Sequence, residues 1–88
     1  MPDTATETRL SKVNPVLAKK VRHVIEAAKF QGVEFRVVQG LRTYAEQDAL
    51  YAQGRTKPGH RVTNARGGQS NHNFGLAVDV VPFDNGQP

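Results

Sequence analysis

The chain has 88 residues, enough for one small domain, and it contains no cysteine. Disulfide bonds and cysteine zinc sites are thereby excluded, so a bound metal would have to be held by His, Asp, Glu or water. The net charge of +4 favours an anionic partner, nucleic acid or an acidic cell-wall polymer. The basic residues do not cluster, since Lys19 with Lys20 is the densest pair, so a soluble basic protein without such a partner is an equal alternative.

Two helices and a strand are predicted in the first half of the chain. Residues 1–13 are expected to form a polar arm without the apolar stretch of a secretory signal. A helix then begins with Asn14 as its N-cap and Pro15 in the first helical position. Its apolar residues recur at helical spacing and predict one buried face, made of Leu17, Val21, Val24, Ile25 and Ala28. The alternation within VEFRVVQ, residues 33–39, predicts a strand with one buried face, and a capping box at Thr43 and Glu46 opens the second helix, which ends at Gly54.

The second half of the chain is expected to contain little regular structure. Residues 55–72 form a glycine-rich connection, and loops of that length are often functional. LAVDVV, residues 76–81, predicts a buried strand that Pro82 stops. The order of elements indicates an α+β fold, a small antiparallel sheet with helices packed on it. The strands are too few for a complete sheet, which suggests that the C-terminal part is missing.

Asp79 is the most informative residue, because it interrupts an apolar strand. A buried carboxylate is costly unless it is paired, hydrogen-bonded or bound to a metal. On the strand pattern alone, hydrogen bonds to backbone amides or an arginine are the more ordinary explanation. His72 stands seven residues earlier, and one His with one Asp can supply two of the three protein ligands of a catalytic zinc site.

The surrounding motif strengthens the metal hypothesis. QSNHNFGLAVDVVP, residues 69–82, contains Ser70-x-His72-x-x-Gly75-x-Ala77-x-Asp79. This pattern resembles the signature of zinc peptidases that cut peptidoglycan stem peptides, the D-alanyl-D-alanine carboxypeptidases and the L-alanyl-D-glutamate endopeptidases of bacteria and phage endolysins. The resemblance continues upstream through VVQGLRT (37–43) and LYAQGRTKPGHRVTNARGGQS (50–70), and is closest to the endopeptidase branch.

The resemblance implies a hedgehog/DD-peptidase-like fold. It assigns residues 14–83 to the N-terminal two-thirds of the peptidase domain and leaves 84–88 as a polar tail. The implied activity is zinc-dependent hydrolysis of stem-peptide amide bonds, in the course of cell-wall degradation. We therefore expect zinc as cofactor, peptidoglycan stem peptides as substrate, a monomer, and neither nucleic-acid binding nor membrane insertion. The enzyme would act at the cell wall or in the periplasm, as a phage endolysin released from the cytoplasm or as a bacterial enzyme whose leader was removed.

The resemblance also assigns roles to individual residues. It makes His72 and Asp79 the first two zinc ligands, and Arg42 a catalytic residue that binds substrate and stabilises charge on the attacked carbonyl. Ser70 would contact the substrate backbone, and Gln47 would help to frame the cleft. Without the resemblance, a surface salt bridge for Arg42, a turn hydroxyl for Ser70 and a solvated helix face for Gln47 are the ordinary interpretations.

The sequence departs from the family after Asp79. The family places a third histidine ligand and an acidic general base downstream, where this sequence has no histidine and only Asp84 as an acid. His60 lies at a position that the family does not use for zinc, and His23 is expected to be solvated. The chain is thus expected to be truncated before these groups and to have little activity alone. The alternative is a non-catalytic wall-binding or regulatory module that retains the cleft.

Overall fold

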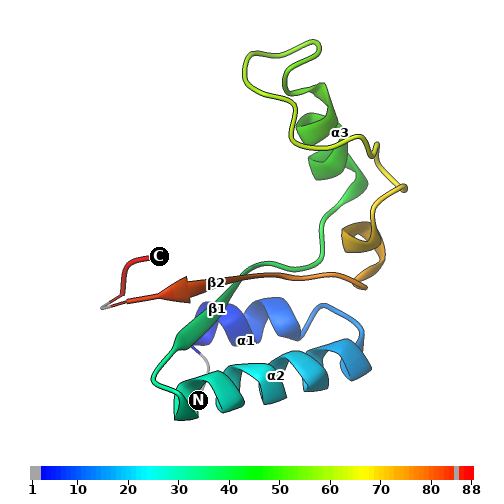
Figure 1. The fold of residues 1–88 in the computed structure, drawn as a ribbon. Helices are drawn as coiled ribbons and strands as arrows, with labels where there is room; N and C mark the ends of the chain where they lie inside the picture. Colours follow the sequence, from blue (N-terminus) through cyan, green and yellow to red (C-terminus); the bar gives the residue numbers. More distant parts are fainter. Residues whose placement is uncertain (1–2, 85) are drawn as a thin grey trace.

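The computed structural model describes residues 3–84 and 86–88. In chain order its elements are α1 (Thr4–Leu10), α2 (Pro15–Phe30), β1 (Glu34–Gln39), α3 (Tyr44–Ala52), the 3-10 helix η1 (Asn71–Phe74) and β2 (Asp79–Phe83). β1 and β2 form a two-stranded antiparallel sheet. Helices α1 and α2 lie against this sheet, whereas α3 and the loop after it extend away from it (Figure 1). The predicted fold class, α+β with a small antiparallel sheet and helices packed on it, is confirmed.

Helix α2 begins where the sequence predicts. The side-chain oxygen of Asn14 accepts hydrogen bonds from the backbone N–H of Val16 (2.9 Å) and of Leu17 (3.2 Å), and Pro15 occupies the first turn. These contacts satisfy two of the backbone donors that every helix start leaves without an internal partner. The cap therefore fixes where the helix starts.

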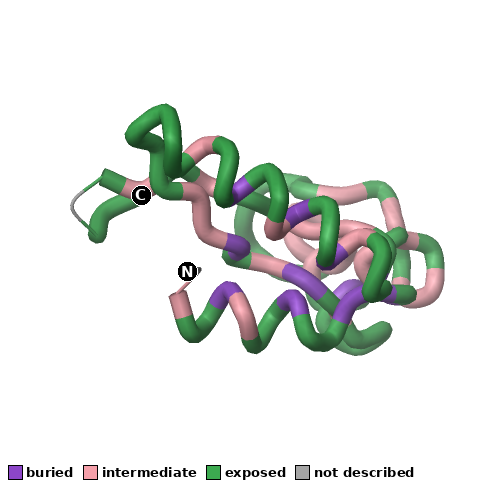
Figure 2. Tube along the Cα trace, turned by 90° about the horizontal axis from the view of Figure 1, so that it is seen from below, coloured by how far each residue is buried: buried purple, intermediate pink, exposed green. Residues whose placement is uncertain are grey.

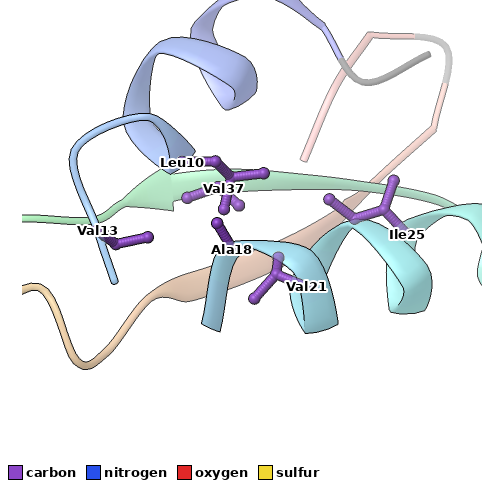
Figure 3. Close-up of a cluster of buried hydrophobic side chains, with 6 residues drawn as sticks. All are labelled: Leu10, Val13, Ala18, Val21, Ile25 and Val37. Carbon is purple, nitrogen blue, oxygen red and sulfur yellow. The ribbon is translucent and has the colours of Figure 1, made fainter. Parts of the chain in front are cut away.

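A small apolar core joins both N-terminal helices to the first strand (Figure 3). Its buried residues are Leu10, Val13, Ala18, Val21, Ile25 and Val37. Val24 was predicted to share the buried face of α2 but is 58% exposed. It lies roughly 90° around the helix from the centre of the face formed by Ala18, Val21 and Ile25, beyond the reach of the narrow sheet.

The expected polar arm at residues 1–13 is wrong for the residues that the structure describes, because Thr4–Leu10 forms helix α1. The Thr6 hydroxyl accepts the N–H of Val37 (3.0 Å), and the Arg9 guanidinium donates to the carbonyl of Val37 (2.9 Å). Side chains of α1 thus occupy the edge of β1 that β2 leaves open. Covering an edge in this way removes exposed strand groups that would otherwise pair with other chains.

The strand predicted over 76–81 is present, but its bounds and its burial are wrong. β2 begins at Asp79, Leu76 is exposed, and the strand continues through Pro82, which pairs with Phe35. Pro82 is tolerated because β2 lies at the edge of the sheet, where a residue without an N–H need not break a ladder bond. Val78 packs against the core, so alternation directs Asp79 away from it.

The long connection after α3 is held to that helix by hydrogen bonds. The backbone N–H of Gly67 donates to Asp48 (2.7 Å), and the Gln47 amide donates to the carbonyl of Ala65 (2.8 Å). We call α3 together with residues 53–69 the arm, and the rest of the described chain the body. In the arm only Gln47 is buried, whereas the buried apolar residues lie in the body (Figure 2).

Candidate metal centre

The imidazole of His72 is held in one orientation by the turn between β1 and α3. Its Nδ1 lies 2.9 Å from the carbonyl oxygen of Gly40. A carbonyl can only accept, so Nδ1 is the donor in this contact, and Nε2 is the ring nitrogen left to face Asp79. The His72 side chain is only 13% exposed. Anchoring one ring nitrogen on a backbone carbonyl is the usual way in which proteins present the other nitrogen to a metal.

Asp79 faces this free nitrogen from the first residue of β2. Its Oδ1 lies 3.6 Å from Nε2 of His72, so the structure brings the two predicted ligands together. The carboxylate side chain is 54% exposed, which corrects the premise that Asp79 is a buried charge. The sheet has only two strands, and the face to which Asp79 points is not the one that packs on the core.

Arg42 lies beside the pair, in the turn that leads from β1 to α3. Its Nη2 is 3.9 Å from Oδ2 of Asp79, and its Nη1 donates to the side-chain oxygen of Gln47 (2.8 Å). The Arg42 side chain is 12% exposed, and its Nε is buried without a hydrogen-bond partner among the described residues. The guanidinium is therefore partly buried and oriented, unlike an ordinary surface salt bridge.

Gln47 is fully buried and links the arm to the site. Besides accepting from Arg42, it donates to the carbonyl of Ala65 (2.8 Å) and weakly to the Thr63 hydroxyl (3.4 Å). The solvated helix face that the residue type alone favours is wrong. Gln47 orients Arg42 and ties the loop at 63–65 to α3.

The hydroxyl of Ser70 caps η1 and accepts the N–H of His72 (3.2 Å), so it positions His72 through the backbone. Asn73 is not among the predicted site residues, yet it is buried and connects both segments of the site. Its side-chain oxygen accepts from the N–H groups of Gly68 and Ser70, and its amide donates to the carbonyl of Arg42 (2.9 Å). The S-x-x-N spacing, with Asn in place of the usual Glu or Gln of a capping box, is the signal that could have identified it.

The donors in this site suit two positions of a zinc centre. An imidazole lone pair and a carboxylate oxygen are both common zinc ligands, and the exposed side of Asp79 leaves room for further ligands. Within residues 3–84 and 86–88, no group of three or more His, Cys, Asp or Glu side chains is close enough to hold a metal. His23 and His60, the other two histidines, are exposed, on α2 and in the arm respectively.

A held imidazole beside a carboxylate, with a partly buried arginine within reach, is an arrangement that can serve metal-assisted hydrolysis. Two comparisons then identify the family. The D-alanyl-D-alanine carboxypeptidase (VanY) family model matches residues 10–87, and the chain is 45% identical over 71 residues to the peptidoglycan L-alanyl-D-glutamate endopeptidase CwlK of Bacillus subtilis (strain 168). The chain belongs to the VanY family of peptidoglycan peptidases, which confirms the resemblance inferred from the motif.

The match to the Bacillus subtilis relative covers most of this chain but less than half of the relative. The aligned region covers 81% of this chain and 42% of the Bacillus subtilis relative, so the chain spans less than half the length of that protein. The family match begins at Leu10, within the segment predicted to be a polar arm, where the side chain is part of the core.

Proposed function

We propose that this chain carries the N-terminal two-thirds of the catalytic domain of a zinc-dependent peptidoglycan peptidase, with two of its metal ligands. The proposed reaction is hydrolysis of a stem-peptide amide bond of the L-alanyl-D-glutamate type. The observation that carries the proposal is the 3.6 Å approach of the anchored His72 imidazole to the Asp79 carboxylate. Membership of the VanY family supports the class of enzyme, and the identity to the Bacillus subtilis endopeptidase supports the type of bond.

His72 and Asp79 would hold the metal, with Nε2 and a carboxylate oxygen as donors. Zinc in such a site lowers the pKa of a bound water to about 7 and polarises the scissile carbonyl. Arg42 would place a fixed positive charge near the carbonyl oxygen on which negative charge develops. Because Gln47 already holds Nη1, that charge needs little reorganisation during the reaction. Ser70 would act by positioning His72, and also by contacting the substrate backbone.

A second candidate function is a non-catalytic module that binds cell-wall peptide. The observation in its favour is that the described residues bring together two metal-ligand side chains and no third. A third ligand and an acidic base, which the resemblance implies, would have to come from elsewhere for hydrolysis to occur. Both candidates use the same cleft and differ only in the chemistry that follows binding.

The substrate, location and assembly follow as further parts of the proposal. We infer that peptidoglycan stem peptides are the partner, that residues 14–83 form the peptidase part, and that the protein works as a monomer at the cell wall. Among the helices that the structure describes, none has the length and apolar character needed to cross a membrane.

Calorimetric titration with zinc tests the metal site. We expect the unaltered chain to bind zinc, His72→Ala and Asp79→Ala each to abolish binding, and His60→Ala, a control on an exposed histidine, to leave it unchanged. Binding that survives the first two substitutions would disprove the site. Incubating the zinc-loaded chain with a soluble stem peptide then tests for catalysis, because release of cleaved peptide would exclude the non-catalytic module.

A further inference from the structure

The excess positive charge of the chain is concentrated in one segment. Four of the twelve Lys and Arg residues lie between positions 49 and 78, where no Asp or Glu occurs. The other eight basic residues are matched in number by the eight acidic ones, so this segment accounts for the whole net charge of +4. The four are Arg55, Lys57, Arg61 and Arg66, and all of them lie in the arm.

Two of these side chains lie over the ring of Tyr51, at the end of α3, and a third lies near Gly54, just after the helix. The guanidinium carbon of Arg55 lies 3.9 Å from the centre of the Tyr51 ring, and that of Arg66 lies 4.9 Å from it. Arg66 also donates to the Tyr51 hydroxyl (3.3 Å). Arg61 packs beside the helix end, since a Cβ placed on Gly54 would lie 2.9 Å from its Cγ. We call Tyr51 with these three arginines the Tyr51 cluster.

Arg55 is the fixed member of the Tyr51 cluster. It donates to the carbonyls of Tyr51 (2.7 Å) and Thr63 (3.0 Å) and to the side chain of Asn64 (3.1 Å). These bonds join the end of α3 to the loop, so the guanidinium of Arg55 is held in a fixed position on the arm. Arg61 and Arg66 are exposed, and Arg66 donates from Nη2 to the Tyr51 hydroxyl.

No carboxylate within the described part of the chain forms an ion pair with the cluster arginines. Asp48, one turn before Tyr51 on α3, is occupied by the backbone N–H of Gly67. The arginines act on Tyr51: the hydrogen bond from Arg66, and after it the charges of Arg66, Arg55 and Arg61, lower the pKa of the phenol.

We propose that the Tyr51 cluster is a second binding surface, which takes the phosphodiester groups of an anionic cell-wall polymer. Guanidinium groups match phosphate oxygens through paired N–H donors, and stacking on an aromatic ring leaves those donors free at the edge. The cluster lies on the arm, whereas His72 and Asp79 lie in η1 and β2 (Figure 1), so the polymer would hold the protein on the wall through residues other than these two. That the polymer belongs to the wall rests on the proposed function.

The geometry favours such a polymer over single-stranded nucleic acid. Proteins that bind single strands stack bases on exposed aromatic rings. Arg55 and Arg66 both lie over the ring of Tyr51, which is therefore already used for stacking. Binding through phosphate groups alone needs only the arginine edges.

The test compares two double variants that each remove two positive charges. Arg61→Ala/Arg66→Ala alters the cluster, and Lys19→Ala/Lys20→Ala removes two exposed charges from α2. Binding is measured to poly(glycerol phosphate), and to cell-wall sacculi before and after acid removal of their phosphodiester polymers. We expect the arginine variant to bind the polymer about tenfold more weakly or worse, because hydrogen bonds to charged groups are lost, and the lysine variant to bind nearly as the unaltered chain does.

Three results would overturn the proposal: equal losses in the two variants, undiminished binding to sacculi stripped of phosphodiester polymers, or tighter binding of duplex DNA through the same arginines. Should the alanine variant melt early, Arg61→Gln/Arg66→Gln provides the same comparison. Zinc titration of the arginine variant keeps this test separate from that of the proposed function. Retained zinc binding with lost polymer binding supports the second surface, and lost zinc binding in His72→Ala does not affect it.

Discussion

The position of Arg42 depends on a buried neighbour, Gln47. Gln47 is fully buried, accepts from the Arg42 guanidinium and donates to the loop at Ala65, so one amide satisfies partners from two segments. A buried amide with both ends paired is stabilising, whereas a buried partner left unpaired costs the full desolvation of that group. The orientation of Arg42 is therefore coupled to the packing of the arm.

Replacing Gln47 by Met tests this coupling. Methionine has a similar volume but no hydrogen-bonding amide, so it leaves the guanidinium of Arg42 and the carbonyl of Ala65 without these partners. We expect unfolding free energy to fall by about 1–3 kcal/mol, measured by urea denaturation. Gln31→Met, at the exposed end of α2, is the matched control and should change stability little. Equal effects of the two substitutions would contradict the role given to Gln47.

The sequence identified most of the side chains that the structure gathers, but not how they are held. His72, Asp79, Arg42 and Gln47 lie together, and Ser70 supports His72. The resemblance to a family is enough to find such residues, because it assigns positions in segments that are distant in the sequence. It gives no access to Asn73, whose bonds to Arg42 and Gly68 depend on the path of the chain between distant positions. The roles assigned to the predicted site residues stay predictions.

Among the helices, those whose starts are set by local hydrogen bonds were predictable from the sequence. Those that depend on contacts between distant residues were not. The starts of α2 and α3 follow from Asn14 and from Thr43 with Glu46, whose bonds span at most three residues. Helix α1 has no comparable cap bond, and its Thr6 instead binds Val37, which is 31 residues away. The mostly polar sequence of α1 therefore does not predict that the helix covers the edge of β1.

The capping box of α3 should stabilise the protein measurably. The Thr43 hydroxyl accepts the N–H of Glu46 (3.0 Å), and the Glu46 carboxylate accepts the N–H of Thr43 (2.9 Å). Losing an N-cap side chain costs about 1 kcal/mol, so Thr43→Ala should lower the melting temperature. Thr56→Ala, in the exposed loop of the arm, is the control. An unchanged melting temperature in Thr43→Ala would show that the box does not stabilise α3.

The same box makes a prediction about pH. Hydrogen bonds from Thr43 lower the pKa of Glu46 below its ordinary value of 4.5. A lowered carboxyl pKa in the folded state stabilises the protein above the unfolded pKa, and this contribution is lost as pH falls through the folded pKa. The stability difference between the unaltered chain and Glu46→Gln should thus be present at neutral pH and shrink below pH 4.5. A difference that is constant from neutral to acid pH would contradict this linkage.

At the scale of the whole molecule, the body and the arm are stabilised differently. The apolar core lies entirely in the body, between α1, α2 and β1. The arm is held by polar contacts: the amide of Gln47, the carboxylate of Asp48 and the guanidinium of Arg55. The proposed metal site lies where the two parts meet, since Arg42 comes just before the arm in the chain and His72 and Asp79 come after it.

This difference should appear as two levels of protection in native-state hydrogen exchange. Regions with few buried apolar contacts open locally at lower free energy than the core. Backbone amides of α3 and of residues 53–69 should therefore exchange faster than those of Ile25 in α2 and of the strand β1. Zinc bound by His72 and Asp79 would slow exchange around η1 and the 42–43 turn, because a ligand that binds only the folded form suppresses opening. Equal protection of arm and body would mean that they open as one unit, and the polar contacts would then have to be as strong as the core.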